Sequence, residues 1–229
     1  MSVLEMKNVS FAYPNNPVIK NLSYQFECGK VYAITGRSGA GKTTVLSLLS
    51  GLIAPVAGEI LYEGKNIAKL NKYEYRSRDV GVIFQEYNLL PKFTARENII
   101  LSMDVSGKKL NTLTDFGTFE KKSDYADALL ELVGLESDVI ADSRVLKISG
   151  GQQQRIAIAR ALSIQPKVIL ADEPTGNLDT DTSEDIMKIF LKLAHENERC
   201  VIIVTHSPLI AEMADERLEL KPLSRRGDY

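Results

Sequence analysis

The sequence of 229 residues has no tryptophan, only two cysteines, and no apolar run near the roughly 20 residues that span a bilayer. Cys28 and Cys200 lack the spacing of metal ligands, so we expect buried or incidental thiols. The first five residues also lack the charged and apolar regions of a secretory signal peptide. We therefore expect a cytoplasmic protein, which would reach a membrane only by binding another protein.

The charge balance is nearly neutral, with a formal net charge of −2. This argues against the broad positive surface that nucleic acid requires, so we predict no nucleic-acid partner. The composition, 44% hydrophobic and 25% charged, is that of an ordinary globular protein. The chain is long enough to bury one substantial core, with room for an inserted lobe.

Residues 36–43 match the phosphate-binding pattern G-x-x-x-x-G-K-[ST] at every fixed position. The apolar, β-prone residues 31–35 precede the match, and residues 43–50, which a glycine follows, have the pattern of a helix. Between strand and helix, the glycines can turn backbone N–H groups toward a phosphate at the positive end of the helix dipole. A chance glycine-rich turn would not need these flanks. Lys42 would reach the β- and γ-phosphates, and the Thr43 hydroxyl would bind Mg²⁺.

The chain before this loop is predicted to form β structure. Leu22, Tyr24 and Phe26 alternate with polar residues, and residues 58–64 have the pattern of a hairpin strand between two turns. Tyr13 lies in a predicted loop, beside a proline and two asparagines. Its ring could stack on a nucleotide base or pack against the small β-layer, and the spacing alone favours packing.

Three further predicted strands end in polar side chains, at the side where open α/β sheets bind ligands. They cover residues 79–84, 167–171 and 200–205, and they are followed by Gln85, by Asp172 with Glu173, and by His206. In a P-loop protein Asp172 would bind Mg²⁺, and Glu173 would orient or deprotonate the attacking water. Two adjacent carboxylates repel each other, which disfavours simple solvated loop acids. Gln85 alone is weak evidence, and His206 alone could be structural or catalytic.

Between the first two of these strands the pattern becomes helical. Residues 94–97 match a capping box and predict a helix through Met103. We expect a loop over residues 104–122 and a second helix over residues 123–133. Residues 86–147 therefore predict a helical lobe inserted between two halves of an α/β core.

A second candidate phosphate cradle follows this lobe. Ser149 is a favourable N-cap for a helix predicted over residues 152–163, and Gly150 and Gly151 stand between them. A structural cap would need Ser149 but would hardly need both glycines. From the residues alone, the functional and the structural interpretation both stay open.

Together these motifs resemble, in order and spacing, those of ABC-type ATPases along essentially the whole chain. Residues 36–43 resemble the Walker A motif, Gln85 the Q-loop, 149–152 the signature, 168–173 Walker B, Asp179 the D-loop and His206 the switch histidine. The resemblance implies an α/β fold, a P-loop NTPase (RecA-like) core with an N-terminal antiparallel β subdomain and an inserted helical subdomain. We expect one domain over 1–229, with residues 1–85 and 153–229 in the core and β subdomain and residues 86–152 in the helical subdomain. Ile148, where the family usually has Leu, is a conservative departure.

The resemblance also implies a head-to-tail homodimer that binds ATP and Mg²⁺. Each ATP would lie between the P-loop of one subunit and Ser149 and Gly151 of the other. The implied catalytic residues are Glu173, as the base, with His206 and Gln85; the implied Mg²⁺ site is Thr43, Gln85 and Asp172. The implied nucleotide-binding residues are Tyr13, on the adenine, with Gly36, Arg37, Ser38, Gly39, Ala40, Gly41, Lys42, Thr43, Thr44, Ser149, Gly150, Gly151, Gln152 and Asp179.

Within the family, residues 84–91, 94–98 and 171–179 are similar to those of lipoprotein-releasing, macrolide-exporting and cell-division (FtsE-like) ATPases. That branch works with FtsX/MacB-type membrane permeases, in some cases with a periplasmic or extracellular accessory protein. Residues 104–122 and 144–147 depart from its usual pattern. The resemblance thus implies a transporter subunit at the inner face of the membrane, with an FtsE-like force-transmitting regulator as the alternative. A soluble ABC ATPase acting on DNA or ribosomes is disfavoured, because this chain has neither a long coiled coil nor a second ATPase domain.

The same resemblance implies that the lobe after Gln85 accepts a helix of the permease. Tyr87, Leu89 and Leu90 would form the apolar socket, because interface cores favour aromatic and aliphatic anchors. Packing inside the lobe is the alternative, above all for Leu89.

Overall fold

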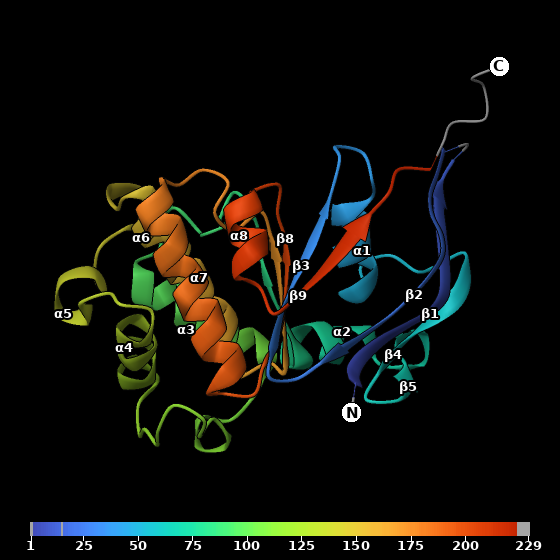
Figure 1. Ribbon diagram of the computed structural model, residues 1–229. Coiled ribbons are helices and arrows are strands. Elements are labelled where there is room, and N and C mark those ends of the chain that lie inside the picture. Colours follow the sequence, from blue (N-terminus) through green and yellow to red (C-terminus); the bar gives the residue numbers. More distant parts are fainter. Residues whose placement is uncertain (1, 15, 224–229) are drawn as a thin grey trace.

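A parallel sheet forms the centre of the computed structural model, which describes residues 2–14 and 16–223 (Figure 1). The strand order is β6-β7-β8-β3-β9, and every neighbouring pair is parallel. The strands are β3 (Lys30–Gly36), β6 (Val80–Ile83), β7 (Val168–Asp172), β8 (Cys200–Val204) and β9 (Glu216–Leu220). The predicted buried strands are therefore confirmed.

A second, antiparallel sheet packs beside the first, in the order β2-β1-β4-β5. It consists of β1 (Ser2–Tyr13), β2 (Asn16–Glu27), β4 (Ala57–Tyr62) and β5 (Lys65–Asn66). The predicted β subdomain is confirmed, but the loop predicted around Tyr13 is wrong in part. Tyr13 is the last residue of β1 and pairs with Asn16 of β2, because cross-strand hydrogen bonding extends the hairpin almost to its tip. Asn15, also in that predicted loop, lies outside the described residues.

Helices cover the parallel sheet on both faces. The helices in the described part of the chain, some of which lie in the helical lobe away from the sheet, are α1 (Lys42–Leu49), α2 (Lys72–Glu74), α3 (Ala95–Ser106), α4 (Lys122–Leu132), α5 (Ser137–Ile140), α6 (Gly150–Leu162), α7 (Thr180–His195) and α8 (Pro208–Met213). The longest of these has 16 residues, and no helix in the described part of the chain combines the length and apolarity that a membrane crossing needs.

Two hydrophobic cores lie on the two faces of the parallel sheet, because side chains alternate along each strand. Ile169 and Val201 face one core, which also contains buried side chains of α3, α4, α6 and α7. Leu170 and Ile202 face the other core, which contains buried side chains of α1 and of the antiparallel sheet. As a result, α1 and α6 are on opposite faces of the parallel sheet (Figure 1).

The helical lobe has the predicted helices with shifted ends. The capping box of Thr94 and Glu97 is present, and α3 continues three residues beyond the predicted end, to Ser106. The predicted loop over 104–122 therefore begins later, and it adds Leu113, which is only 1% exposed, to the core. Helix α6 begins at Gly150 and not at residue 152, because the Ser149 side chain caps the helix from before Gly150. The predicted subdomain boundary between residues 152 and 153 thus falls inside α6.

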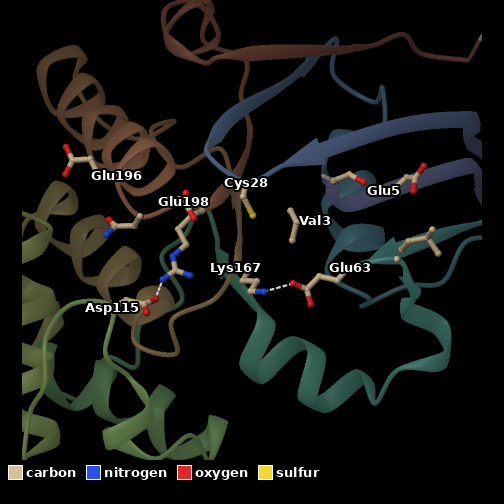
Figure 2. A pocket seen from close by; sticks show the side chains of 13 residues that line it. Val3, Glu5, Cys28, Glu63, Asp115, Lys167, Glu196 and Glu198 are labelled. Atoms are coloured by element: carbon tan, nitrogen blue, oxygen red, sulfur yellow. Dashed lines mark hydrogen bonds and ion pairs between the residues drawn. The ribbon is translucent and has the colours of Figure 1, made fainter.

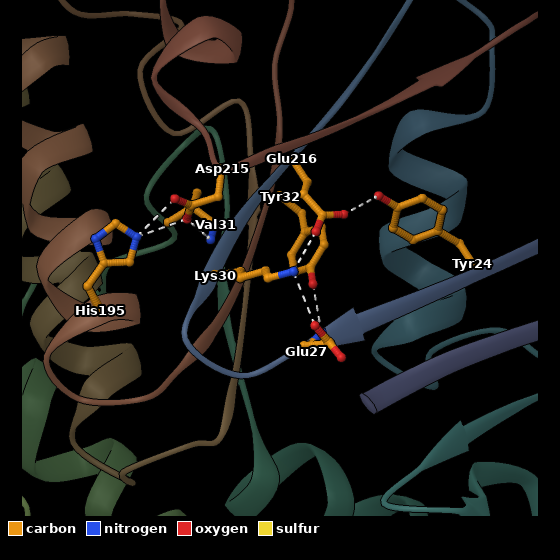
Figure 3. A network of polar contacts seen from close by, with 8 residues as sticks. All are labelled: Tyr24, Glu27, Lys30, Val31, Tyr32, His195, Asp215 and Glu216. Carbon is orange, nitrogen blue, oxygen red and sulfur yellow. Dashed lines mark hydrogen bonds and ion pairs between the residues drawn. The ribbon is translucent and has the colours of Figure 1, made fainter. Parts of the chain in front are cut away.

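A polar network joins the N-terminal ends of β3 and β9 to α7 (Figure 3). Asp215 accepts a hydrogen bond from the Val31 backbone N–H at 2.7 Å, and both of its oxygens lie 3.0 Å from His195 Nε2. Lys30 forms an ion pair with Glu216 at 2.7 Å. These contacts hold the edge strand β9 against β3, whose opposite end leads into residues 36–43.

Candidate active site

The loop between β3 and α1 needs glycine at two positions. Gly36 and Gly41 have φ angles of 146° and 92°, which side chains rarely allow. A Cβ on Gly36 would lie 2.4 Å from the carbonyl oxygen of Leu220 in β9, and one on Gly41 would lie 2.7 Å from Val18 Cγ1 in β2. The loop is therefore packed tightly from behind by both sheets, which keeps its backbone in one conformation.

The beginning of α1 is open to an anion. The N-cap, Gly41, provides no side-chain hydrogen bond, and the first turn contains no acidic residue. The unsatisfied N–H groups of that turn and the helix dipole favour a negative charge there. Lys42 Nζ donates to the carbonyl oxygens of Gly36 at 3.0 Å and Arg37 at 3.4 Å, so its ammonium group lies over the loop. These features fit the phosphate groups of a nucleotide.

The parallel register brings the polar strand ends to the same edge as this loop. Asp172, the last residue of β7, pairs with Val204, the last residue of β8, and Ile34 of β3 pairs with Val204 from the other side. Thr43, in the first turn of α1, donates its hydroxyl to Asp172 Oδ1 at 3.4 Å. Sequence positions 129 residues apart thus form one polar cluster.

Glu173 and His206 form the closest side-chain pair of this cluster. Glu173 Oε2 lies 2.8 Å from His206 Nδ1 and accepts the His206 backbone N–H at 3.2 Å. Glu173 has a left-handed backbone, with φ of 47°, and its N–H donates to Val204 at 3.0 Å. A strained conformation held by specific bonds is common at functional sites. The Glu173 side chain is only 14% exposed, so it is fixed in place beside the loop.

The environment of Asp172 is suited to a cation. Burial raises the pKa of this carboxyl, and the neighbouring Glu173 raises it further, while Thr43 and Lys42 oppose the rise. A half-buried carboxylate beside a second carboxylate is stabilised by a nearby positive charge. Thr43 and Asp172 together offer the oxygen ligands that Mg²⁺ prefers.

Gln85 and Tyr13 lie at the borders of the cluster. Gln85 is exposed after β6, with its amide nitrogen 3.6 Å from the place that a Cβ on Gly176 would take. Tyr13 is 48% exposed and contacts Phe11 edge-on at 5.0 Å between ring centroids. Because β2 passes Gly41 at Val18, the hairpin tip that carries Tyr13 lies at the same end of the molecule as the loop (Figure 1). The Tyr13 ring thus packs partly against Phe11 and leaves the rest of its surface exposed.

The second candidate cradle is a capped helix start. The Ser149 side chain accepts the Gln152 N–H at 3.3 Å, and the Gln152 side-chain oxygen accepts the Ser149 N–H at 3.1 Å. A Cβ on Gly150 would lie 3.2 Å from the Tyr87 hydroxyl, and one on Gly151 would lie 2.9 Å from Thr182 Cγ2. Side chains of the same chain thus crowd both glycine positions, and the functional and the structural interpretation of the two glycines both stay open.

Asp179 is the N-cap of α7. It accepts hydrogen bonds from the Thr182 N–H and the Thr182 hydroxyl, both at 2.9 Å. These bonds lower the pKa of its carboxyl group. In this chain both carboxylate oxygens of Asp179 are used to begin α7, and the same Thr182 lies against Gly151. Thr182 therefore lies against both Asp179, the D-loop residue, and Gly151 of the second cradle.

A large pocket of about 770 Å³ lies at the opposite end of the sheet from the polar cluster (Figure 2). Lys167 and Arg199, which precede β7 and β8, line it together with the exposed, free Cys28. Lys167 forms an ion pair with Glu63, and Arg199 with Asp115. None of the predicted site residues lines this pocket. The polar cluster around residues 36–43, and not the pocket, is thus the candidate active site.

Comparison with protein families agrees with this geometry, since the model of the family described as ABC transporter matches residues 19–176. The chain belongs to this family. The ABC protein is 43% identical to the uncharacterized ABC transporter ATP-binding protein YclH of Bacillus subtilis (strain 168), over 100% of this chain and 96% of YclH. It is 36% identical to the lipoprotein-releasing system ATP-binding protein LolD of Saccharophagus degradans, over 98% of both chains. It is also 35% identical to the macrolide export ATP-binding/permease protein MacB of Syntrophobacter fumaroxidans, over 93% of this chain and 30% of MacB.

Solved structures support the same assignment. The dimeric structure of the ABC transporter cassette MJ0796 matches with a TM-score of 0.83 and 33% identity, covering 95% of this chain and 94% of that one. A second MJ0796 structure, a dimeric post-hydrolysis state bound to ADP and Pi, matches with a TM-score of 0.83 and 32% identity, covering 96% of both chains. The chain therefore has the ABC cassette fold predicted from its motifs, and it is an ABC-type ATPase subunit.

Two residues of this ABC ATPase were missed from the sequence although they contact the predicted motifs. Thr182 lies between Asp179 and Gly151, and Arg160 on α6 donates to the backbone carbonyls of Tyr87 and Asn88, just after Gln85. Helical periodicity indicates core positions in α6 only for apolar residues such as Ile156, Ala159 and Leu162. A single arginine between two alanines was the available signal, but its partners are 72 and 73 residues away in sequence.

Proposed function

We propose that the protein dimerises head to tail around two ATP molecules and drives a separate FtsX/MacB-type permease in export or in lipoprotein or peptide extrusion. One observation carries the dimer. The P-loop begins α1 and the second cradle begins α6, and these helices pack on opposite faces of the parallel sheet. This separation favours our proposal that Ser149 and Gly151 contact the nucleotide of another subunit in a closed symmetric pair. The cassette MJ0796, which was solved as a dimer, supports dimerisation of this chain.

In each site, Lys42 and the first N–H groups of α1 bind the phosphates, and the Tyr13 ring stacks on the adenine. Thr43 and Asp172, with Gln85, would hold Mg²⁺, which when bound supplies charge neutralisation to the phosphates. We assign to Glu173 the role of accepting the proton of the attacking water, because it directly follows Asp172, which accepts the Thr43 hydroxyl of α1. His206 keeps the Glu173 carboxylate in place through the 2.8 Å contact.

The permease is proposed from the relatives and from the surface. The printed name of MacB joins ATP-binding and permease parts, and LolD is the ATP-binding part of a lipoprotein-releasing system. A groove of about 310 Å³ follows the edge strand β6, where Val82 and Val105 line it. Just beyond β6, Phe84 and Leu90 are 37% and 41% exposed. We therefore place the protein on the cytoplasmic side of the membrane through this surface, with any accessory protein reached through the permease.

The three residues predicted to form a socket separate in the structure. Leu89 packs against the core, and the Tyr87 hydroxyl is turned toward Gly150. Only Leu90 combines an exposed side chain with a fixed backbone, since Asn98 accepts its N–H at 2.8 Å. Of the three predicted socket residues, we therefore retain only Leu90 as a contact with the permease.

Leu90→Ala is expected to weaken binding of the proposed permease by about tenfold, because an aliphatic anchor at an interface contributes on the order of 1–2 kcal/mol. Melting temperature and basal ATPase activity should stay at parental values. Co-purification from detergent and permease-stimulated ATPase activity measure the effect. Leu89→Ala is the matched control, and we expect it to lower the melting temperature instead. Normal permease binding by Leu90→Ala would contradict this docking surface.

A further inference from the structure

The pocket at the opposite end of the parallel sheet from the polar cluster contains an incompletely paired arginine (Figure 2). Arg199, which directly precedes β8, lines this pocket and is only 8% exposed. Its Nη2 donates to the Asp115 carboxylate, but its buried Nε has no hydrogen-bond partner in the described part of the chain. A buried donor without an acceptor is unfavourable, so an acceptor that reached this nitrogen would be bound favourably.

Another arginine of the same chain has the complete arrangement. Arg96 donates from Nε to Asp127 Oδ1 at 2.8 Å and from Nη2 to Asp127 Oδ2 at 3.1 Å, so one carboxylate accepts from both nitrogens. Of the same two nitrogens, Arg199 uses only Nη2 for Asp115. We call these two nitrogens of Arg199 the Arg199 fork. A carboxylate that took the place of Asp115 could accept from both of them.

Asp115 is suited to being displaced. It lies between α3 and α4, and its side chain is 38% exposed, so little buried surface is lost when it turns away. Phe116 and Phe119 pack against the core and anchor the surrounding loop independently of this ion pair. The loop belongs to residues 104–122, where the sequence departs from the usual pattern of its branch. A segment that departs from that pattern thus forms one wall of the pocket.

The charges of the pocket favour a cationic molecule. The two cationic side chains, Lys167 and Arg199, are each matched by an acidic partner. Three further acidic residues also line the pocket, namely Glu5, Glu196 and Glu198. In the described part of the chain, neither Glu196 nor Glu198 forms an ion pair. A simple anion would therefore be repelled, whereas a molecule with ammonium groups would be attracted.

We propose that this pocket binds a molecule that combines one carboxylate with more than one cationic group, the chemistry of a basic amino acid or of a short basic peptide. The carboxylate accepts from the Arg199 fork in place of Asp115. The cationic groups lie toward Glu196 and Glu198. The site is separate from the nucleotide site, and it does not rest on the proposed dimer.

The size and the apolar part of the pocket agree with this chemistry. Its volume of about 770 Å³ is within the range of ordinary ligand sites. Val3, Leu61 and Cys28 also line it, and they provide an apolar surface for the aliphatic parts of the molecule. A basic side chain has such an aliphatic part between its backbone and its charge.

The test is calorimetry on the full-length protein with two pairs of probes: L-lysine with L-lysinamide, and tri-L-lysine with its C-terminal amide. Each amide lacks the carboxylate and carries one more net positive charge. A surface that only attracts cations would bind the amide at least as tightly as the acid. In the proposed site, the acid form of one or both pairs should bind about tenfold more tightly, because its carboxylate fills the Arg199 fork.

Four variants assign this preference to residues of the pocket. Asp115→Asn removes the competing carboxylate and should increase the preference for the acid form several-fold. Arg199→Lys lacks the fork and should abolish the preference. Glu198→Gln should weaken the acid and the amide form alike. Glu120→Gln is the matched control, because Glu120 is exposed on the same loop as Asp115 but does not line the pocket, and it should change neither affinity.

The melting temperature of each variant shows whether it is folded, and Asp115→Asn with Glu198→Gln decides the question if Arg199→Lys is not. Equal binding of acid and amide forms by the parent would overturn the proposal. No binding of either L-lysine or tri-L-lysine at millimolar concentration would do the same, as would equal losses in Glu120→Gln and Glu198→Gln. A preference for the acid form in only one pair supports the proposal and distinguishes an amino acid from a peptide.

Discussion

Glu173→Gln is expected to reduce ATP turnover about 10²- to 10⁴-fold while ATP binding stays intact, because the water loses its base and the phosphate cradle is unchanged. Among the described residues, no hydrogen bond joins Glu173 to the P-loop; its carboxylate lies 2.8 Å from His206 Nδ1. Retained ATP should hold two subunits together, which light scattering can measure as an ATP-dependent doubling of mass. The exposed Glu120 gives a matched control, Glu120→Gln, that should hydrolyse ATP normally.

The contact between Glu173 and His206 provides a second test of the role of Glu173. His206→Ala should lower turnover less than Glu173→Gln, because the carboxylate remains but is less well oriented. The double variant should be no slower than Glu173→Gln alone, since residues that act as a unit are not additive. Parental turnover in Glu173→Gln, or independent losses that multiply in the double variant, would show that Glu173 has a different role.

The second prediction distinguishes the role of the P-loop from that of the second cradle at Ser149. Lys42→Ala should weaken ATP binding by the isolated subunit about 10- to 100-fold, because charge-assisted hydrogen bonds to phosphate contribute on the order of 1.5–3 kcal/mol. Ser149→Ala should leave ATP binding by the monomer within about twofold, yet strongly reduce ATP-driven dimerisation and hydrolysis. Calorimetry on the monomer and light scattering on the Glu173→Gln background measure the two quantities separately.

Two control variants test whether the effects come only from loss of a helix cap or from loss of a surface charge. Ser149 is also the N-cap of α6, so its loss costs about 1 kcal/mol of stability by itself. Ser149→Asn keeps a favourable cap, and it should still dimerise poorly if the hydroxyl has a role across the interface. The exposed Lys65 controls for loss of charge through Lys65→Ala. Equal loss of monomer affinity in Lys42→Ala and Ser149→Ala would contradict a site shared between subunits.

Local patterns were sufficient for much of the fold. The apolar run at residues 31–35 predicted β3, and the capping box at Thr94 predicted the beginning of α3, because both depend on short-range periodicity and on one hydrogen-bonding side chain. The errors occurred where distant partners decide the structure. Pro14 and its neighbours indicated a loop, but pairing with β2 keeps Tyr13 in a strand. The loop predicted over residues 104–122 is confirmed between α3 and α4, apart from residues 104–106 and 122, but its polar composition did not indicate that Leu113 is buried in the core.

The sequence by itself determined which residues are the candidates for the chemistry, because the P-loop pattern and the polar strand ends are local features. It could not determine that Asp172, Glu173 and His206 meet beside Thr43, since that depends on the parallel order of strands far apart in the chain. The tertiary structure also decided that α1 and α6 pack on opposite faces of the sheet, and that Arg160 holds the turn after Gln85. The physical reason is the same in each case: hydrogen bonds and packing between distant segments depend on topology, which no short stretch of sequence contains.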